Sequence, residues 1–228
     1  MWILCLRQSV SQEEKTMSEI TIKALTPELI EDYFDFFDNR AFSDGSPYYP
    51  CYCNAFNLSL EQLQKDVFDR VPEYGEGKEG VRLALRSSAW KMVQEGLIQG
   101  YLAYDNDIAV GWCNANDRLS YFRVGEFDID EAPVDSVPDD CPNKGFIKSI
   151  VCFEISPEYR GQGIAGKLLD RVCKDAASDG YSFVEGYPKE EAKDSSLSFT
   201  GPYKLYARAG FTEHARNGKT VIMRKALG

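Results

Sequence analysis

Hydrophobic and polar positions follow one another along this chain in two patterns, which predict strands and helices mixed throughout its length. Alternating or compact apolar runs predict strands at 20–25, 100–104, 108–113, 148–155 and 181–187. Apolar residues at helical spacing predict helices at about 29–39, 60–68, 81–95, 164–172 and 202–209. The strands at 211–214 and 220–224 are expected to form a closing hairpin, like the two strands that flank Asp105-Asn106-Asp107.

The remaining segments show where the folded part begins and where long loops lie. We expect residues 1–16 to be a disordered tail or an over-extended start, with Met17 opening the folded part; a short docked strand is the alternative. Residues 41–56 are rich in turn formers, 117–144 read as an acidic surface excursion, and a loop passes through Ser195-Ser196. No repeat or linker interrupts 17–228, which we therefore interpret as a single domain.

The segment between the strand at 148–155 and the following helix carries three overlapping phosphate-binding patterns. Gly161-x-Gly163-x-x-Gly166 matches a dinucleotide fingerprint, and Gly161-x-x-x-x-Gly166-Lys167 nearly matches a P-loop. Arg160-x-x-Gly163-x-Ala165 matches the pyrophosphate loop of acyl-CoA-dependent acyltransferases. A glycine loop that opens a helix leaves N–H groups unpaired at the positive end of the helix dipole, where a pyrophosphate binds. The alternative is a helix start whose glycines serve packing.

Two of the three patterns fit their surroundings poorly. A P-loop needs Ser or Thr after its lysine to hold Mg²⁺, and Leu168 stands there. Glu185 lies at about the distance at which a dinucleotide fold places its ribose-binding acid. However, Pro157 ends the strand well before Gly161, and only 62 residues (228 − 166) follow Gly166, too few for most of a doubly wound sheet.

The third pattern extends into a longer resemblance. The run from Ile150 to Ala165 closely resembles motif A of the GNAT superfamily of N-acetyltransferases, and Leu205-Tyr206-Ala207-Arg208-Ala209-Gly210-Phe211 resembles that superfamily's helix-to-strand segment. Together these matches cover roughly 145–225. The resemblance implies an α+β fold, a central mixed twisted sheet with helices on both faces in the order βααβββαβαββ, here with extra N-terminal helices.

The resemblance also implies a cosubstrate and its binding residues. Acetyl-CoA would lay its pantetheine along the strand residues Phe153, Glu154 and Ile155. Its pyrophosphate would meet the N–H groups of the loop, with charge added by Arg160. The residues concerned are Arg160, Gly161, Gln162, Gly163, Ile164 and Ala165.

The resemblance further implies catalytic roles in acetyl transfer to a primary amine of a small molecule or peptide, with Tyr206 at the family's general-acid tyrosine position. Such an amine is mostly protonated at neutral pH, so a base must remove a proton, and Glu154 and Glu185 are the candidates. The two carboxylates could also raise each other's pKa. A strand N–H near Phe153 would stabilise the oxyanion. Tyr206, with Tyr203 as the fallback, would protonate the CoA thiolate. The alternatives are solvent-facing carboxylates and a tyrosine that only packs.

The acceptor is expected to bind over the segment 41–56. By the resemblance, its pocket would be lined by Tyr48, Tyr49, Cys51, Tyr52, Cys53 and Phe56. Packing of these residues onto the core is the alternative. No metal is expected, since the chain has no CxxC pair and His214 is its one histidine. Two other classes of function stay open: a CoA-binding sensor without catalysis, and a nicotinamide-dependent oxidoreductase.

Composition narrows the partners and the compartment. The net charge is −10, which argues against nucleic acid and favours a cationic substrate, unless it serves solubility alone. No apolar run approaches the ~20 residues of a membrane span. The N-terminal apolar run is too short for a signal peptide, so we expect a cytoplasmic protein with seven reduced cysteines. A homodimer stays open, because the sequence does not fix the oligomeric state.

Overall fold

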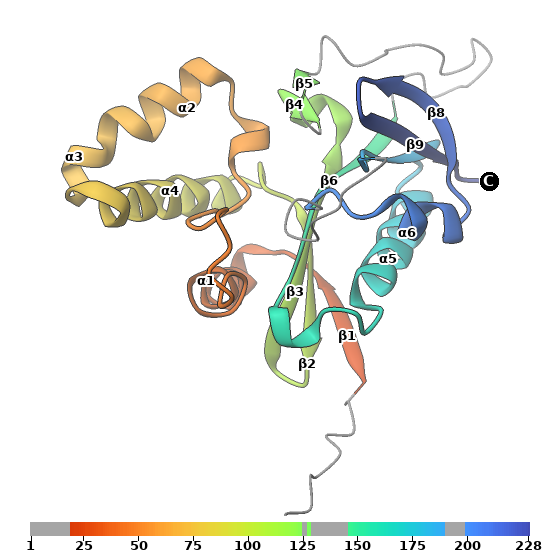
Figure 1. Cartoon of the computed structure of the whole chain (residues 1–228), viewed down its shortest axis with the longest axis horizontal. Coiled ribbons are helices and arrows are strands. Elements are labelled where there is room, and N and C mark those ends of the chain that lie inside the picture. Colours follow the sequence, from red (N-terminus) through yellow and green to blue (C-terminus); the bar gives the residue numbers. More distant parts are fainter. Residues whose placement is uncertain (1–18, 125–126, 129–145, 190–198) are drawn as a thin grey trace, which may run out of the picture.

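A seven-stranded sheet forms the centre of the computed structural model, which describes residues 19–124, 127–128, 146–189 and 199–228 (Figure 1). Its strand order is β1-β2-β3-β6-β7-β9-β8. The strands are β1 Ile20–Ala24, β2 Gly100–Asp105, β3 Ile108–Asp117, β6 Ile147–Ile155, β7 Phe183–Gly186, β8 Thr212–Asn217 and β9 Thr220–Ala226. β6 and β7 run parallel, and the other neighbours in this sheet pair antiparallel. A small hairpin, β4 Arg123–Val124 and β5 Phe127–Asp128, stands apart.

Helices cover both faces of the sheet (Figure 1). One face carries α1 Ile30–Asn39 and α4 Gly77–Gln94, with α2 Leu60–Asp66 and α3 Val71–Tyr74 outside them. The other face carries α5 Ile164–Ser178 and α6 Tyr203–Arg208. Short 3₁₀ turns occur at Pro27–Leu29, Ala55–Asn57, Phe68–Arg70, Arg118–Ser120 and Pro157–Tyr159. In the described part of the chain, no helix is both long enough and apolar enough to cross a bilayer.

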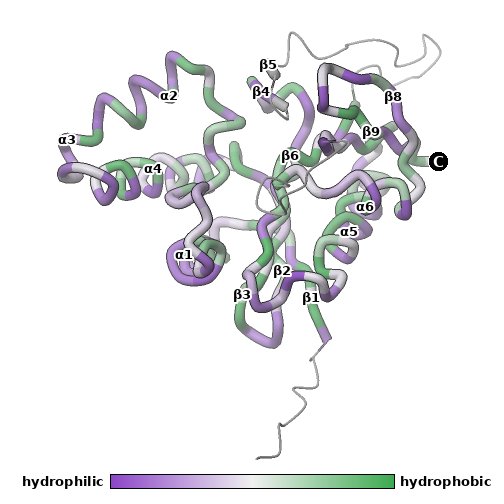
Figure 2. Tube along the Cα trace, in the orientation of Figure 1, coloured by the Kyte–Doolittle hydropathy of each residue, from purple (hydrophilic) through white to green (hydrophobic). Residues whose placement is uncertain are grey.

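The sheet separates two hydrophobic cores because successive side chains of a strand point to opposite faces. In β2, Tyr101 and Ala103 belong to the core under α5, whereas Leu102 and Tyr104 belong to the core under α1 and α4. The α1 side is rich in aromatic rings, among which Tyr33 packs edge-on against Trp112 with centroids 5.0 Å apart. Figure 2 shows hydrophobic and hydrophilic positions alternating along α4, as expected of a helix with one buried face.

The fold class and the order of elements expected from the sequence are confirmed. Because the described sheet contains one parallel pair and is otherwise antiparallel, it is not doubly wound, and the dinucleotide-binding alternative is wrong at the level of the fold. The expected tail at 1–16, the loop through Ser195-Ser196 and most of the excursion at 117–144 lie outside the described residues.

Two element boundaries and one short helix differ from the sequence prediction. α4 begins at Gly77 rather than near 81, since burial of Ala84, Ala89 and Met92 outweighs the low helix propensity of its glycines. α3 was not expected. β3 continues to Asp117, past the predicted end at 113, because the polar residue Asn114 is buried and bonded there.

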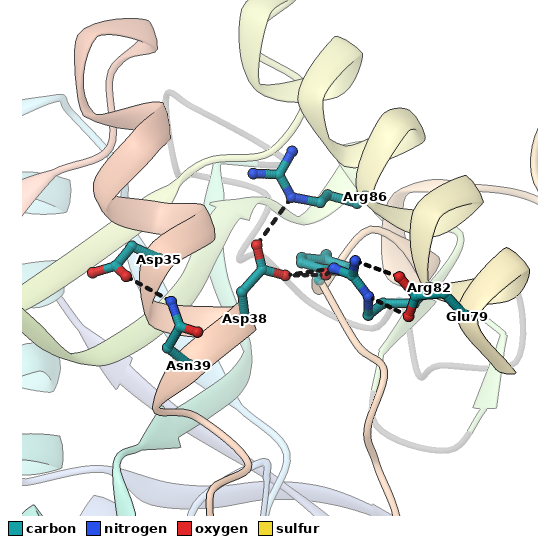
Figure 3. A network of polar contacts seen from close by, with 7 residues as sticks. Asp35, Asp38, Asn39, Glu79, Arg82 and Arg86 are labelled. Atoms are coloured by element: carbon teal, nitrogen blue, oxygen red, sulfur yellow. Dashed lines mark hydrogen bonds and ion pairs between the residues drawn. The ribbon is translucent and has the colours of Figure 1, made fainter. Parts of the chain in front are cut away.

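A network of charged and phenolic groups joins α1 to α4 (Figure 3). The Asp38 carboxylate accepts hydrogen bonds from Arg82 and Arg86, both at 3.0 Å, and from the Tyr52 hydroxyl. Arg82 also pairs with Glu79 at 2.7 Å. Asp38 is only 23% exposed, so its charge is satisfied by the protein more than by water. This network fixes the residues before α2 against the helical layer.

We predict that Asp38→Ala destabilises the protein more than the same change at Asp35 on the same helix. Asp38 loses three partly buried contacts to charged or phenolic groups, which is expected to lower the free energy of unfolding by about 2–3 kcal/mol. Asp35 is 52% exposed, so its loss should cost less than about 1 kcal/mol. Urea denaturation of both variants measures this difference, and equal losses would show that the network stabilises nothing.

Candidate functional site

The loop before α5 is built to present backbone N–H groups to a ligand. Gly161 and Gly163 have φ values of +76° and +82°, a range that side chains with a Cβ rarely adopt. A Cβ built on either glycine would meet nothing within 4 Å, so the loop surface is open. Among the described residues, none accepts a hydrogen bond from the six N–H groups of 161–166. This loop therefore matches an anion-binding helix start.

A cavity of about 540 Å³ lies between this loop and α6. Its basic residues are Arg160 on the loop side and Lys204 and Arg208 on the α6 side, against one carboxylate, Asp170. Sequence reasoning missed Lys204 and Arg208, although their spacing of four places both on one face of the predicted helix. The cavity thus adds basic side chains to the N–H groups that the loop presents.

The strand β6 has a free edge beside this cavity. Only Ile147–Ile150 pair with β7, whereas the opposite edge stays paired with β3 as far as Ile155. Phe153 and Ile155 thus lie where the two parallel strands have separated. The Phe153 N–H donates to the carbonyl of Phe199 at 2.5 Å, so a loop residue partners part of this edge.

Glu154 lies on the same stretch of β6, with its side chain 12% exposed. Burial raises the pKa of its carboxyl to about 7, while the nearby Arg160 guanidinium lowers it and Asp44 raises it further. The Arg160 Nη2 lies 3.2 Å from the Glu154 carboxylate, and its Nη1 lies 2.5 Å from Asp44. A carboxyl that titrates near neutrality is suited to accept a proton from a substrate.

Glu185, the second candidate base, is placed differently. It is fully buried, with Arg224 Nη2 at 2.5 Å and Arg118 Nη1 at 3.4 Å from its carboxylate, and it also accepts a hydrogen bond from Tyr187 at 2.9 Å. It pairs across the sheet with Ser149, five residues before Glu154, which is a separation of roughly 16 Å along the strand. The two carboxylates do not meet, so the expectation that they act on each other is wrong. Glu185 neutralises two buried arginines instead.

Tyr206 lies beneath the point at which β6 and β7 separate. It is fully buried, and burial raises the pKa of its phenol well above the ordinary value, so the hydroxyl stays protonated. It donates to the carbonyl of Thr200 at 2.7 Å, next to the Phe199 carbonyl that accepts from Phe153. The structure therefore brings the two expected donors, the Tyr206 hydroxyl and the Phe153 N–H, to consecutive carbonyl groups. The fallback residue Tyr203 is partly buried against the α5 core.

The residues expected to line an acceptor pocket divide into two groups. Tyr52 and Cys53 are 1% exposed, and Tyr52 packs on Phe34 and Phe37 in the core, which is the packing alternative. By contrast, Tyr48 packs on Phe199, and Cys51 is half-buried near Glu154. Phe56 also packs on Phe199, whereas Tyr49 packs on Phe42 under Lys78. Of these partly exposed residues, Cys51 lies near Glu154 of β6, and Tyr48 lies against Phe199, whose carbonyl bonds to β6.

Five described cysteines are free thiols. Contact with Cys53 and burial raise the pKa of the Cys51 thiol, and contact with Cys152 raises that of Cys53. In the part of the chain that the structure describes, no three His, Cys, Asp or Glu side chains are grouped so that they could hold a metal ion.

A family model described as "Acetyltransferase (GNAT) domain" matches residues 98–213, just over half of the chain. The match spans the central strands, the phosphate loop, α5 and α6. The chain therefore belongs to the GNAT acetyltransferase family. No curated protein matches the sequence.

Solved structures with a similar fold include several acetyltransferases at low sequence identity. The PaiA N-acetyltransferase from Thermoplasma acidophilum, in complex with coenzyme A, is 14% identical, with 92% of this chain and 99% of that chain covered and a TM-score of 0.48. An N-acetyltransferase from Staphylococcus aureus Mu50 is 13% identical, with 92% and 100% covered and a TM-score of 0.49. The ribosomal-protein-S18-alanine N-acetyltransferase from Escherichia coli is 11% identical, with 92% and 94% covered and a TM-score of 0.45.

The raised pKa of Glu154 predicts a pH-dependent effect of Glu154→Gln on stability. A carboxyl whose pKa rises from 4.5 to about 7 on folding contributes most below pH 4.5, and that contribution is lost as the pH rises to 7. Relative to wild type, Glu154→Gln should therefore gain up to ~3 kcal/mol between pH 4.5 and 7, and no more above. Urea denaturation across pH 4–9 measures this. The control Glu158→Gln, an exposed carboxyl of the same segment, should show no such rise; an equal rise in both would contradict the burial argument.

Proposed function

We propose that this protein transfers an acetyl group from acetyl-CoA directly to a primary amine of a small molecule or peptide. The observation that carries the proposal is the run of six N–H groups at 161–166, which have no hydrogen-bond acceptor among the described residues. These groups lie at the start of α5, beside a cavity lined by three basic side chains. Membership of the GNAT family supports acetyl-CoA as the ligand of this loop.

The cofactor would be held by two kinds of contact. The loop N–H groups and the basic residues Arg160, Lys204 and Arg208 would bind its phosphates. The pantetheine arm would lie along the free edge of β6 at Phe153 and Ile155, as an added strand does. For this, the carbonyl of Phe199 must give up the Phe153 N–H. When bound, acetyl-CoA supplies a thioester, which is activated toward attack by an amine.

The residues of this chain can supply the proton transfers. Glu154 removes a proton from the acceptor ammonium, directly or through water, and the free amine attacks the thioester carbon. The N–H of Phe153, once released from Phe199, donates to the developing oxyanion. As the carbon–sulfur bond breaks, Tyr206 gives its proton to the CoA sulfur. The second proton that the amine nitrogen loses as the amide forms returns to the Tyr206 phenolate through solvent. Glu185 takes no part in these proton transfers, because its carboxylate is buried in ion pairs with Arg118 and Arg224. Glu154 is therefore the proposed base.

The acceptor would enter beside Tyr48 and Cys51, where the segment 41–56 faces β6. The aromatic rings of Tyr48, Phe56 and Phe199 would contact its apolar part. The overall charge of −10 would attract a cationic amine. A cytoplasmic location would supply both acetyl-CoA and reduced cysteines.

We predict that Gly163→Ala weakens CoA binding, whereas Gly180→Ala at the other end of α5 does not. Both glycines have nearly the same φ, +82° and +81°, and both would place a new Cβ in open space. Their backbone strain is therefore matched, and only Gly163 lies at the unbonded N–H groups. Calorimetric titration with CoA should show at least a tenfold weaker Kd for Gly163→Ala, about 1.4 kcal/mol. Equal losses, or binding of NAD in preference to CoA, would contradict the proposed loop function.

We predict that kcat/KM for the amine rises as the pH passes through about 7, the pKa of Glu154. Below that pH the base is protonated and cannot accept the ammonium proton. In Glu154→Gln this limb should disappear, and kcat/KM at pH 8 should fall about 100-fold or more.

The measurement is release of the CoA thiol with a panel of primary amines between pH 5 and 9. Tyr206→Phe should lower kcat and leave CoA binding in place. Tight binding of CoA with no turnover on any amine would overturn the catalytic proposal and indicate a sensor instead.

A further inference from the structure

Two carboxylates from separate segments of the chain meet at the Arg160 guanidinium. The guanidinium Nη1 lies 2.5 Å from Asp44, in the segment 41–56 on the acceptor side. Its Nη2 lies 3.2 Å from Glu154 on β6, and its Nε donates to the carbonyl of Ile155 at 3.0 Å. The acceptor side, the base and the phosphate loop are thus joined through one side chain.

The Arg160 guanidinium is shared unequally between the Asp44 and Glu154 carboxylates. Nε donates to the backbone of β6, and the two terminal nitrogens bond one carboxylate each, Nη1 to Asp44 and Nη2 to Glu154. The contact with Asp44 is shorter than the contact with Glu154, so Asp44 takes the larger share. Asp44 and Arg160 are 35% and 36% exposed, and a pair so exposed adds little to stability. What the pair supplies is the orientation of Arg160.

We propose that Asp44 is a positioning residue for the base: it divides the Arg160 guanidinium between itself and Glu154, and this division sets how readily Glu154 takes the proton of the acceptor amine. The inference rests on the proposed acetyl transfer with Glu154 as base. It adds a residue of the acceptor side that touches neither the acetyl group nor its carrier.

The charges around Glu154 make the direction of the effect definite. Burial has the largest effect and raises the pKa of the Glu154 carboxyl; Arg160 lowers this pKa, and Asp44 raises it further. Trp112 lies opposite Glu154 on β3 and carries no charge. Among the described residues, three thiols of raised pKa also lie near Glu154 and are neutral at pH 7: Cys51, Cys53 and Cys152.

The test compares two variants whose effects must have opposite signs. In Asp44→Asn the guanidinium is free to pair fully with Glu154, so the acid limb of kcat/KM should move to lower pH. In Arg160→Gln the base loses its cation, so the limb should move to higher pH. Each shift should be at least about half a pH unit, roughly threefold in kcat/KM on the limb. Glu158→Gln removes an exposed charge from the same loop and should leave the limb in place.

A second measurement does not depend on turnover. In protein labelled with ¹³C at glutamate side-chain carboxyls, NMR titration without ligands should show the Glu154 midpoint moving in the same two directions. Shifts of equal sign in the two variants, or no shift in Asp44→Asn, would overturn the role of Asp44 while wild-type acetyl transfer stands. If wild type shows no transfer to any amine, the proposed function fails, and the NMR midpoints alone still decide whether Asp44 controls the charge of Glu154.

Discussion

The site depends on the separation of two parallel strands. β6 and β7 pair over only four residues, and beyond Ile150 this edge of β6 has no strand partner among the residues that the structure describes. The Tyr206 ring lies where the two strands separate. A Cβ on Gly186, the last residue of β7, would lie 2.0 Å from this ring. With any larger residue at 186 the ring would have to move. The glycine lets α6 approach the sheet, and the phenol then reaches the loop that crosses the gap.

Each half of this pair of strands carries a glutamate that is paired with arginine, but the two glutamates are in different environments. Glu185 lies in the paired half and is held by two buried arginines, which satisfy its charge at the cost of desolvating all three groups. Glu154 lies in the separated half, where one arginine is shared with a second carboxylate. The first arrangement fixes a charge, whereas the second leaves a carboxyl near the point of titration. The two glutamates differ in their burial and in the number of arginines per carboxylate, not in residue type. These two properties separate the structural Glu185 from Glu154, the proposed base.

The sequence predicted the parts of the fold that depend on local pattern and on the loop motif. Gly161 and Gly163 were recognisable because a phosphate loop needs particular conformations at fixed spacing. The distinction between Glu154 and Glu185 was not, because it depends on Arg118 and Arg224, which reach Glu185 from distant segments. Likewise Asp44 lies 116 residues before Arg160, and no periodicity relates them. Long-range ion pairs of this kind are set by tertiary structure alone.

The segment 41–56, beside which the acceptor is proposed to bind, shows why the sequence can locate a site without identifying its substrate. The segment that carries Tyr48 and Cys51 has few regular elements of its own and is held from behind by buried polar groups. Asn114 on β3 donates to the Cys53 carbonyl at 3.0 Å, and Tyr33 donates to the Tyr52 carbonyl. Tyr52 and Cys53 thus serve as anchors, and the residues just before them are free to differ in shape without disturbing the core. Under the proposed function, selection of the amine is thereby separated from the residues that hold the fold, and Asp44 connects this segment to Glu154 through Arg160.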